Sequence, residues 1–588
     1  MQSVFHKVQS HFWKNAVHTT STTRSMSWEE TLLRDGPYVY FSDIDYTCQN
    51  MAVWDTVNHL RRMQQKLLSE GKSCLQDAAL MADMRGALRY WLDKDFQNPN
   101  WWYNQIGMVS NLAAVTIMLY DVLSPEERTR AAQLLQRGSV AGAPAILKWE
   151  GANLIWGIRD TIYHALVIGD GELLRVASDR IAQEIAVAPA LECGIKADMS
   201  FYQHGPLLYS CGYGRSFTYE TAQLLCMLSG SEFAVAEDKV ALFEDFVLDG
   251  QRYMMHGPAV DYQAVGREIA RPDALSSSAF AMAVEFLLNT DGCRRREELR
   301  QFYDALTGGC HSFSSTKYFP CSYYLSHKTP AFHMSVKGYH THYKGTEWGL
   351  NENRLGYNLN CGGVTTFMAS GKEYYNLSPV WDYAAIPGTT APAWEDAALW
   401  EHSEDNWKSK AGTNDDCGGF SDGSMGALYM RLDHDGFSGY KAYFAYEEGM
   451  VCMGCAIDGP EMLYTTVDQA FRQGELFEKQ TLQKGQGVVN GGFRYVNLSD
   501  APMTAEAKKV TGAWVRNSLS ESAEPVEGNV FLAQIQGDSY AYAVTAQTAQ
   551  DTKIACIVNT PAEQSVTFTD GRRLAVIRQD GKTHIVSE

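Results

Sequence analysis

Four short stretches of the chain concentrate indole, amide, imidazole, phenol and guanidinium groups where a plain core segment would be aliphatic. They are residues 100–107, 151–156, 198–214 and 266–272. Indole faces stack on sugar rings, and side-chain amides can hydrogen-bond hydroxyl groups. Imidazole and phenol groups can transfer protons, and guanidinium groups bind anions. Each stretch also has an ordinary structural explanation.

The first stretch holds two adjacent tryptophans, Trp101 and Trp102, flanked by asparagines. Adjacent side chains on a helix diverge, so the two rings cannot both face one core. At least one ring is therefore predicted to face a cleft, where it could stack on a sugar. The alternative is an ordinary apolar core at a helix junction.

The second and third stretches carry an amide and a candidate proton-transfer pair. Asn153, three residues before Trp156, needs hydrogen-bond partners if it is buried, and helix capping is its default explanation. His204 precedes Tyr213 by nine residues, and Tyr213 lies between Gly212 and Gly214. A lone histidine is more often structural than catalytic, but the glycine-bounded tyrosine favours a joint site.

The fourth stretch has two arginines, Arg267 and Arg271, four residues apart. They share one face if the segment is helical, and a solvated helix face is the plain alternative. A later polar run contains Glu352 and Asn353 and precedes a glycine-rich turn at residues 361–363.

Composition limits the classes of partner. The formal net charge of −19 argues against nucleic acid, and no run of about 18 apolar residues predicts a membrane span. The same negative charge would repel a polyanionic substrate unless a local basic cleft focuses the field. It therefore favours short oligosaccharides over long polymers as substrates.

Thirteen cysteines, an odd number without a framework spacing, indicate reduced thiols. Cys452 and Cys455 form a lone CxxC that we interpret as strand core, and we expect neither metal nor cofactor.

The elements that must position these groups change in type along the chain. Residues 1–315 show apolar residues at helical spacing, with a helix start at Ser124, Pro125 and two glutamates. Many antiparallel helices predict a toroid or solenoid. Residues 316–500 alternate short β-branched and aromatic runs with turns, which predicts an antiparallel β-sandwich. Residues 501–588 predict a small C-terminal β-domain, giving an α+β multidomain chain.

Taken in order, the motifs resemble family 8 polysaccharide lyases, the group of chondroitin AC, hyaluronan and xanthan lyases. The matching elements are NWW with IG, GAN, SFYQHGP with YG, GR followed by R, NEN, EYYN with PVW, and IPGTT. The resemblance extends from about residue 43 to residue 469. It implies an incomplete (α/α) toroid followed by antiparallel β-sandwich domains.

The resemblance also implies roles for particular residues. The catalytic set implied is Asn153, His204, Tyr213, Arg267 and Glu352. The substrate-binding set implied is Trp101, Trp102, Trp156, Arg271 and Asn353.

These residue types suit a β-elimination on a uronate. Removing the C5 proton places charge on the adjacent carboxylate, which Asn153 and His204 could stabilise as donors. Tyr213 could take that proton and return one to the departing oxygen, with Arg267 favouring the phenolate. Glu352 would hold the arginine in place.

Two departures from secreted relatives affect the biological role. No secretory signal is evident at the start, and the C-terminal β-region is short, so we expect a cytoplasmic, monomeric enzyme acting on oligosaccharides. Two alternatives stay open: a glycoside hydrolase on a helical toroid, which would need two carboxylates at the scissile bond, and a non-catalytic carbohydrate-binding protein.

Overall fold

The computed structural model describes residues 1–16, 28–51, 53–141, 149–310, 312–349, 351–401, 408–549 and 551–588. The chain divides into two compact units. The first unit comprises Met1–Ala186, Phe217–Leu242 and Phe286–Arg294. The second unit comprises Val187–Ser216, Phe243–Glu285 and Arg295–Glu588.

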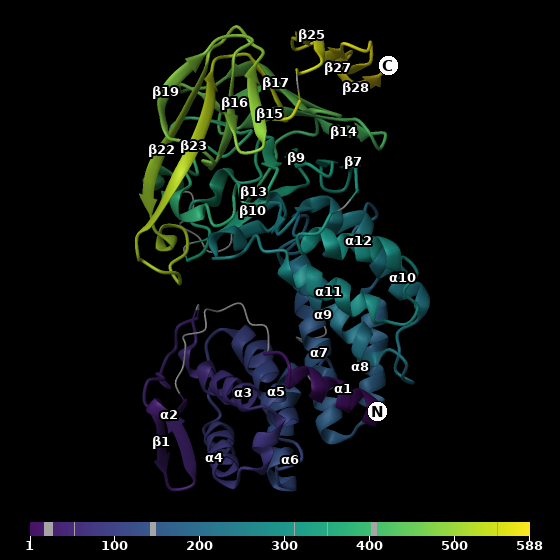
Figure 1. Ribbon diagram of the computed structural model, residues 1–588, viewed down its shortest axis with the longest axis vertical. Coiled ribbons are helices and arrows are strands. Elements are labelled where there is room, and N and C mark those ends of the chain that lie inside the picture. Colours follow the sequence, from purple (N-terminus) through teal and green to yellow (C-terminus); the bar gives the residue numbers. More distant parts are fainter. Residues whose placement is uncertain are drawn as a thin grey trace. The chain divides into compact units, whose positions relative to one another are not determined.

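Helices dominate the N-terminal half of the chain (Figure 1). Their bounds are α1 (Gln2–Phe12), α2 (Trp28–Thr31), α3 (Asn58–Glu70), α4 (Ala78–Lys94), α5 (Met108–Met118), α6 (Pro125–Leu135), α7 (Gly151–Ile168), α8 (Gly171–Glu184), α9 (Tyr213–Leu228), α10 (Glu237–Asp245), α11 (Ser278–Leu288) and α12 (Arg296–Leu306), with α13 (Asp396–Glu401) later in the chain. No helix within the described ranges has the length and apolar character needed to cross a bilayer.

Local sequence explains where these helices begin. The Ser124 hydroxyl accepts from the backbone N–H of Glu127, and the Glu127 carboxylate accepts from the N–H of Ser124. This reciprocal capping box confirms the helix start predicted there. Asp77 and Asp170 cap α4 and α8 in the same manner, with carboxylates that accept from first-turn amides.

The centre of the first unit is α5, which is buried along its whole length. It packs against α1, α3, α6 and α7. A helix that is apolar on every side is stable only when other helices surround it.

Antiparallel sheets form most of the second unit. The seven-stranded sheet has the order β14 (Cys417–Ser421), β15 (Gly426–His434), β16 (Phe437–Tyr446), β17 (Gly449–Asp458), β24 (Tyr540–Ala546), β21 (Phe493–Asn497) and β20 (Gly487–Asn490). The five-stranded sheet has the order β12 (Thr390–Ala391), β18 (Tyr464–Phe471), β23 (Val526–Gln536), β22 (Met503–Gly512) and β19 (Phe477–Leu482). A four-stranded sheet has the order β11 (Val364–Met368), β9 (His333–Lys337), β8 (Tyr324–Lys328) and β7 (Ser315–Phe319).

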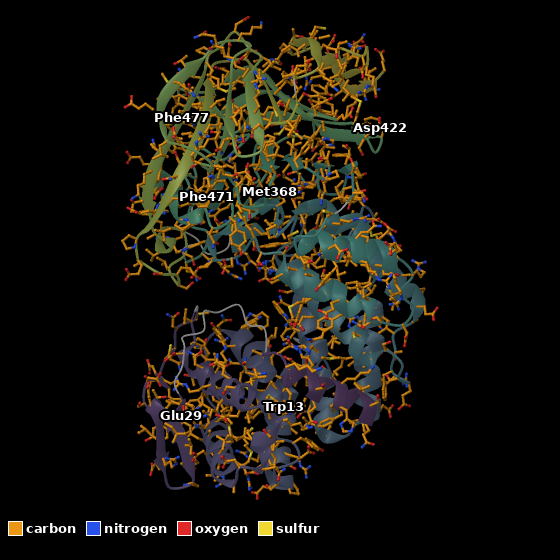
Figure 2. The ribbon with its side chains drawn as sticks, viewed as in Figure 1. Trp13, Glu29, Met368, Asp422, Phe471 and Phe477 are labelled. Carbon is orange, nitrogen blue, oxygen red and sulfur yellow. The ribbon has the colours of Figure 1, made fainter. Side chains whose placement is uncertain are left out.

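Shorter pairings complete the β-structure. They are β1 (Leu32–Asp35) with β2 (Tyr38–Phe41), β3 (Gly194–Ile195) with β4 (Phe201–Tyr202), β5 (Met255–His256) with β6 (Ala259–Val260), and β10 (Lys344–Trp348) with β13 (Lys408–Ala411). Tight turns join neighbouring strands: between β14 and β15, the Asp422 carboxylate accepts from the amides of Ser424 and Met425 (Figure 2).

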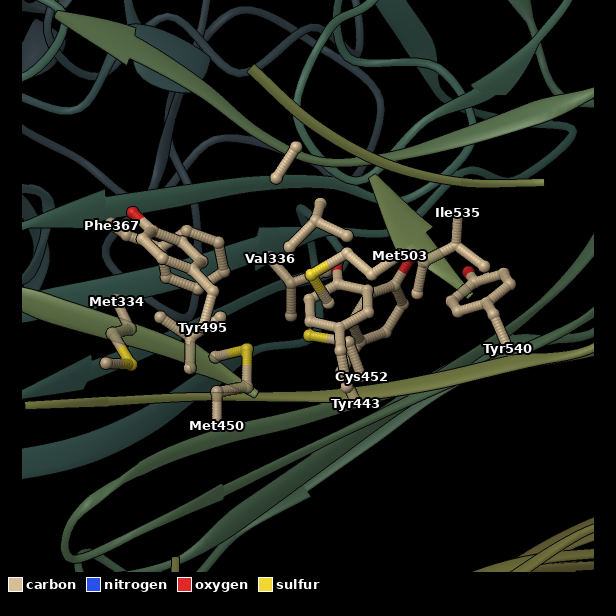
Figure 3. Close-up of a cluster of buried hydrophobic side chains, with 14 of the residues drawn as sticks. Met334, Val336, Phe367, Tyr443, Met450, Cys452, Tyr495, Met503, Ile535 and Tyr540 are labelled. Carbon is tan, nitrogen blue, oxygen red and sulfur yellow. The ribbon is translucent and has the colours of Figure 1, made fainter. Parts of the chain in front are cut away.

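The two faces of the seven-stranded sheet bury different sets of residues, as strand alternation requires. Tyr443 and Cys452 point into a large core shared with the five-stranded sheet and the β7–β11 sheet (Figure 3). Phe444 and Val451, one residue along, point to the other face. The burial of Cys452 and Cys455 within β17 confirms the CxxC pair as strand core.

The second face is covered by a separate four-stranded sheet, β25 (Ile554–Asn559), β26 (Glu563–Phe568), β27 (Arg573–Gln579) and β28 (Lys582–Ser587). Helices followed by antiparallel sheets confirm the predicted fold class. The start of the separate C-terminal sheet is corrected from residue 501 to Ile554. The physical reason is pairing: β22 and β23 hydrogen-bond within the five-stranded sheet, and β24 lies between β17 and β21.

We predict that the C-terminal sheet depends on Phe568, which is 3% exposed and packs on Tyr446 at 4.8 Å between ring centroids. Phe568→Ala should cost about 3–5 kcal/mol, because it opens a cavity between the two sheets. Hydrogen exchange across residues 554–587 should speed up, and the melting temperature should fall. Val558→Ala, in the same sheet but 38% exposed, is the control. Hydrogen-exchange rates in Phe568→Ala equal to those of wild type would contradict this packing role.

Candidate active site

Strand β10 holds the histidine loop through a series of contacts. The backbone N–H of Lys344 donates to the carbonyl of Pro206 at 3.0 Å. The Lys344 ammonium donates to the carbonyl of His204 at 3.1 Å. The N–H of Leu208 donates to the hydroxyl of Tyr343. The loop is therefore fixed by a strand about 140 residues further along the chain.

His204 has the left-handed backbone conformation, with φ of 61°, followed by Gly205 at 90°. A non-glycine residue adopts this conformation at a cost that its surroundings must offset, and such residues cluster at functional sites. The His204 side chain is 33% exposed. Its Nδ1 lies 2.7 Å from Oε1 of Glu347, so Nε2 is the ring nitrogen that remains for a ligand.

Arg267 connects the histidine to the tyrosine. One terminal nitrogen donates to the Tyr213 hydroxyl at 2.7 Å, and the other pairs with Glu347. The rings of His204 and Tyr213 meet edge to face at 4.8 Å between centroids. The predicted joint site of these residues therefore exists as a contact cluster within the second unit.

Tyr209 forms the floor of this cluster. Its hydroxyl donates to Oε2 of Glu347 at 2.9 Å and accepts from the backbone N–H of Arg267 at 3.1 Å. Gly266 has a φ of 58°, and a Cβ built there would lie 2.2 Å from the Tyr209 ring. Glycine is thus required on two grounds, conformation and space, for Arg267 to reach its partners.

Glu352 brings the two predicted arginines together. Its carboxylate accepts from Nε of Arg267 at 2.9 Å and from Nε of Arg271. The segment is a short 3₁₀ helix, η9 (Gly266–Ala270), and Arg271 lies beyond it in extended conformation. The two arginines therefore converge because they share a carboxylate, and the solvated-face interpretation is wrong: the side chain of Arg267 is only 10% exposed.

Asn353 lies behind this surface. It is fully buried, and its amide donates to the carbonyl of Glu347 at 2.7 Å. Asn353 therefore supports the backbone of β10. Its burial leaves no surface for the substrate contact that was predicted for it.

The acid–base properties of the cluster follow from burial and paired charge. Burial alone would raise the pKa of Glu347, but the His204 hydrogen bond and the charge of Arg267 lower it to about 2. The pKa of Glu352 is likewise lowered, because Arg271 and Arg267 outweigh burial. Burial raises the pKa of Tyr213, although Arg267 acts in the opposite direction. Tyr213 is therefore a neutral phenol near neutral pH in the free protein.

The first unit carries the other predicted site residues. Trp101 is 45% exposed, which confirms that the paired tryptophans do not both face the core. Trp149 packs against Trp101 at 5.1 Å between centroids, and Trp156 meets Trp102 edge to face at 5.9 Å. These four indoles form one partly exposed aromatic patch, suited to stacking on sugar rings.

The asparagines around the tryptophans serve the chain itself. The side-chain oxygen of Asn100 accepts from the backbone N–H of Trp102, and the side chain of Asn104 exchanges hydrogen bonds with the backbone of Asn98. A π-helical turn, η3 (Tyr103–Gly107), follows. The amides next to the tryptophans therefore fix the aromatic patch.

Asn153 lies in the first turn of α7 and is partly exposed. Glu150 is the residue before the helix, so Asn153 is not its cap. Among the residues that the structure describes, none is a hydrogen-bond partner of its side-chain amide, which leaves the amide open to a ligand. The prediction that Asn153 and the tryptophans act together with His204 stays a prediction, because they belong to the other unit.

Comparison with known proteins identifies the family. The model of the polysaccharide lyase family 8 N-terminal alpha-helical domain matches residues 4–304, and that of the family 8 super-sandwich domain matches residues 314–555. The chain belongs to polysaccharide lyase family 8. The match begins before residue 43 and ends beyond residue 469, so it exceeds the extent of the motif resemblance.

Individual relatives agree with this family 8 assignment. Chondroitinase-AC from Pedobacter heparinus is 27% identical over 539 residues, which span 87% of this chain and 75% of that protein. A hyaluronate lyase from Cutibacterium acnes is 25% identical over 390 residues, which span 59% of this chain and 47% of that protein. A solved chondroitinase AC lyase, studied in oligosaccharide complexes, matches with a TM-score of 0.86 at 23% identity, covering 100% of this chain and 90% of that chain, and so has the same fold.

Three residues of this family 8 chain escaped prediction from sequence. Glu347 stands five residues before Glu352, and a search for a second carboxylate near NEN could have found it. Tyr209 lies between His204 and Tyr213, and its floor position required the structure. Trp149 precedes GAN by two residues, so a count of tryptophans near that motif would have indicated it.

We predict that Glu347 stabilises the fold in its ionised form. Because its folded pKa, about 2, lies below the ordinary 4.5, the stabilisation is complete above about pH 5 and is lost as the pH falls toward 2. Glu347→Gln should therefore lower the free energy of unfolding by about 3 kcal/mol at pH 7, and the gap to wild type should narrow in acid. Denaturant unfolding at several pH values measures this.

The exposed substitution Glu478→Gln is the control and should show no such trend. A gap between wild type and Glu347→Gln that stays constant from pH 7 to pH 3 would show that the carboxylate charge is not the source of the stabilisation.

Proposed function

We propose that this family 8 chain cleaves a uronate-containing glycan by β-elimination, with Tyr213 as the proton-transfer group. The observation that carries the proposal is the 2.7 Å contact between the Tyr213 hydroxyl and Arg267, beside the partly exposed ring of His204. An arginine at a phenol stabilises the phenolate, which is the form that can accept a proton.

The reaction needs the uronate carboxylate to be stabilised before the C5 proton leaves. Loss of that proton moves charge onto the carboxylate, so donors aimed at its oxygens lower the barrier. With Nδ1 bound to Glu347, His204 has Nε2 left to meet the uronate carboxylate. The family resemblance implies Asn153 as a second donor.

Tyr213 gives its phenol proton to the departing glycosidic oxygen and takes the C5 proton in its place, while the C4–O bond breaks and a double bond forms between C4 and C5. Atoms and charge then balance, and Tyr213 ends the step as the neutral phenol with which it began. The raised pKa of Tyr213 keeps the phenol intact until the substrate is bound. Arg267 reduces the cost of the phenolate at that stage, since its charge opposes the effect of burial.

The geometry disfavours a glycoside hydrolase. Such enzymes use a carboxylic acid of raised pKa opposite a second carboxylate. The two carboxylates that contact Arg267, Glu347 and Glu352, are both paired with arginine, and the pKa of each is lowered. Neither can therefore keep a proton to give to a leaving group near neutral pH.

The relatives named above act, by their names, on chondroitin and hyaluronate, and these are the first substrates to test on this chain. Independence of metal ions is part of the proposal, as is a preference for short oligosaccharides, which the net charge of −19 favours. Cytoplasmic location, a monomeric state and the lack of nucleic-acid or membrane partners stay predictions.

The test of the reaction class is ultraviolet absorbance during incubation with chondroitin, hyaluronan, xanthan and their oligosaccharides, with and without a chelator. Elimination leaves a conjugated double bond, so absorbance should grow and should survive chelation. New reducing ends without absorbance would show hydrolysis and overturn the proposal. Loss of activity on chelation would overturn only the independence of metal ions.

The test of the assigned residue is Tyr213→Phe. Removal of one hydroxyl should lower kcat at least about a thousandfold, because proton transfer is lost, while the affinity for oligosaccharide stays close to that of wild type. Tyr38→Phe, a change at an exposed hydroxyl bonded to Asp93, is the control. Unchanged turnover in Tyr213→Phe would remove Tyr213 from the reaction.

A further inference from the structure

The loop between β22 and β23, residues 513–525, packs directly against the segment that carries Glu352. Ser518 and Glu352 form an isolated antiparallel bridge. The N–H of Leu519 donates to the carbonyl of Asn351 at 2.9 Å. A hairpin from the sandwich thus forms one side of the arginine cluster, about 160 residues away in sequence.

Asn517 anchors this β22–β23 loop. It is fully buried, and its side-chain oxygen accepts from the N–H of Leu355 at 2.9 Å. Its backbone carbonyl accepts from the N–H of Arg354 at 3.1 Å, and its amide donates to the Tyr383 hydroxyl at 2.7 Å. Since this buried amide is well satisfied, the loop has one defined position next to Glu352.

Glu521 is the charged residue that this anchoring brings to the cluster. Its N–H donates to the carbonyl of Ser518 at 3.1 Å, one turn after the bridge to Glu352. The side chain is partly buried and makes no ion pair within 4.0 Å with any residue that the structure describes. Burial raises its pKa, while the charge of Arg271 lowers it and that of Glu352 raises it, so the carboxylate lies in their field.

The cations of the cluster are already engaged. Arg271 contacts Glu352 and Glu268, and Arg267 contacts Glu347, Glu352 and Tyr213. The nearby ammonium of Lys344 donates to a backbone carbonyl. A second anionic group on the substrate, placed beside Arg271 and Glu352, would also lie in the field of Glu521.

We propose that Glu521 is a specificity-determining residue that makes the enzyme select uronate glycans without a sulfate group beside the uronate that reacts. The proposal rests on the lyase function stated above. A sulfate carries a full negative charge at neutral pH, and a like charge at a partly desolvated wall opposes its binding. The single carboxylate of an unsulfated repeat is not penalised in this way, because it is the group that the catalytic donors receive.

The experiment compares kcat/KM on unsulfated chondroitin, 4-sulfated chondroitin and 6-sulfated chondroitin, followed by ultraviolet absorbance. Wild type should favour the unsulfated polymer over at least one sulfated form. Glu521→Gln should shift that ratio toward the sulfated form by at least about fivefold, since it removes one like charge and keeps the side-chain shape. Glu524→Gln, an exposed residue of the same loop, makes the same change of net charge and should leave the ratio as in wild type.

The outcomes separate the two proposals. Growing absorbance with the same ratio in wild type, Glu521→Gln and Glu524→Gln overturns the role of Glu521 and leaves the lyase function standing. A ratio that shifts equally in both variants also overturns it, because net charge alone would then be the cause. Absorbance that never grows on any uronate glycan overturns the lyase function, and the role of Glu521 with it. High added salt should shrink the wild-type preference, and an undiminished preference would contradict the electrostatic cause.

Discussion

The second unit depends on one buried arrangement of charge, in which Arg267 lies between the carboxylates of Glu347 and Glu352. Removing a charged group from water is costly unless its partners are close and well oriented, so each member of the set constrains the others. Arg267 can point at Tyr213 only while both carboxylates hold its other nitrogens. Glu347 in turn fixes the orientation of the His204 ring. The proposed proton transfer and the folding of this unit therefore rest on the same contacts.

Distant segments supply these members, and each segment has its own support. The strand β10 provides Glu347, the 3₁₀ helix η9 provides Arg267, and the start of α9 provides Tyr213. Just before η9, the buried carboxylate of Asp261 accepts from the hydroxyls of Tyr324 at 2.6 Å and Thr366 at 2.8 Å, which ties this part of the chain to β8 and β11. The sandwich thus serves as a rigid frame for the proposed catalytic residues, as sites built on regular elements require.

Local sequence patterns predicted the fold class, and the family resemblance of the ordered motifs implied most members of the cluster. Helical spacing, the capping sequence at Ser124 and strand alternation depend on neighbours along the chain, and they agree with the structure. His204 and Tyr213 were found because glycines mark the turn that holds them. The start of the C-terminal β-domain, predicted at residue 501, was misplaced because the sequences of β22 and β23 do not indicate which strands they pair with. Long-range pairing is decided by the whole sheet.

Other features needed three-dimensional contacts to be understood. The glycine-rich turn at residues 361–363 and the IPGTT motif had no role assigned from sequence, and the structure supplies one: a buried lysine of β16, Lys441, donates to the carbonyls of Gly362 and Gly388 at 2.9 Å. A Cβ at Gly388 would lie 2.2 Å from the carbonyl oxygen of Gly363. Those motifs therefore hold two turns together. Asn353 is similar, because a polar residue in a catalytic motif proved to be a buried support.

The hairpin of β22 and β23 has a consequence for how such an enzyme could diversify. Its two strands pair over ten residues within the five-stranded sheet, and β23 also pairs with β18, so its base is independent of the sequence at its tip. Residues of the tip beyond Leu519, the last residue that bonds to the Glu352 segment, can therefore change in charge, size or number while the arginine cluster keeps its support. A scaffold of this type separates the part that mutation can explore from the part that must stay constant. It offers a place where protein engineers could alter the choice of glycan without rebuilding the catalytic centre.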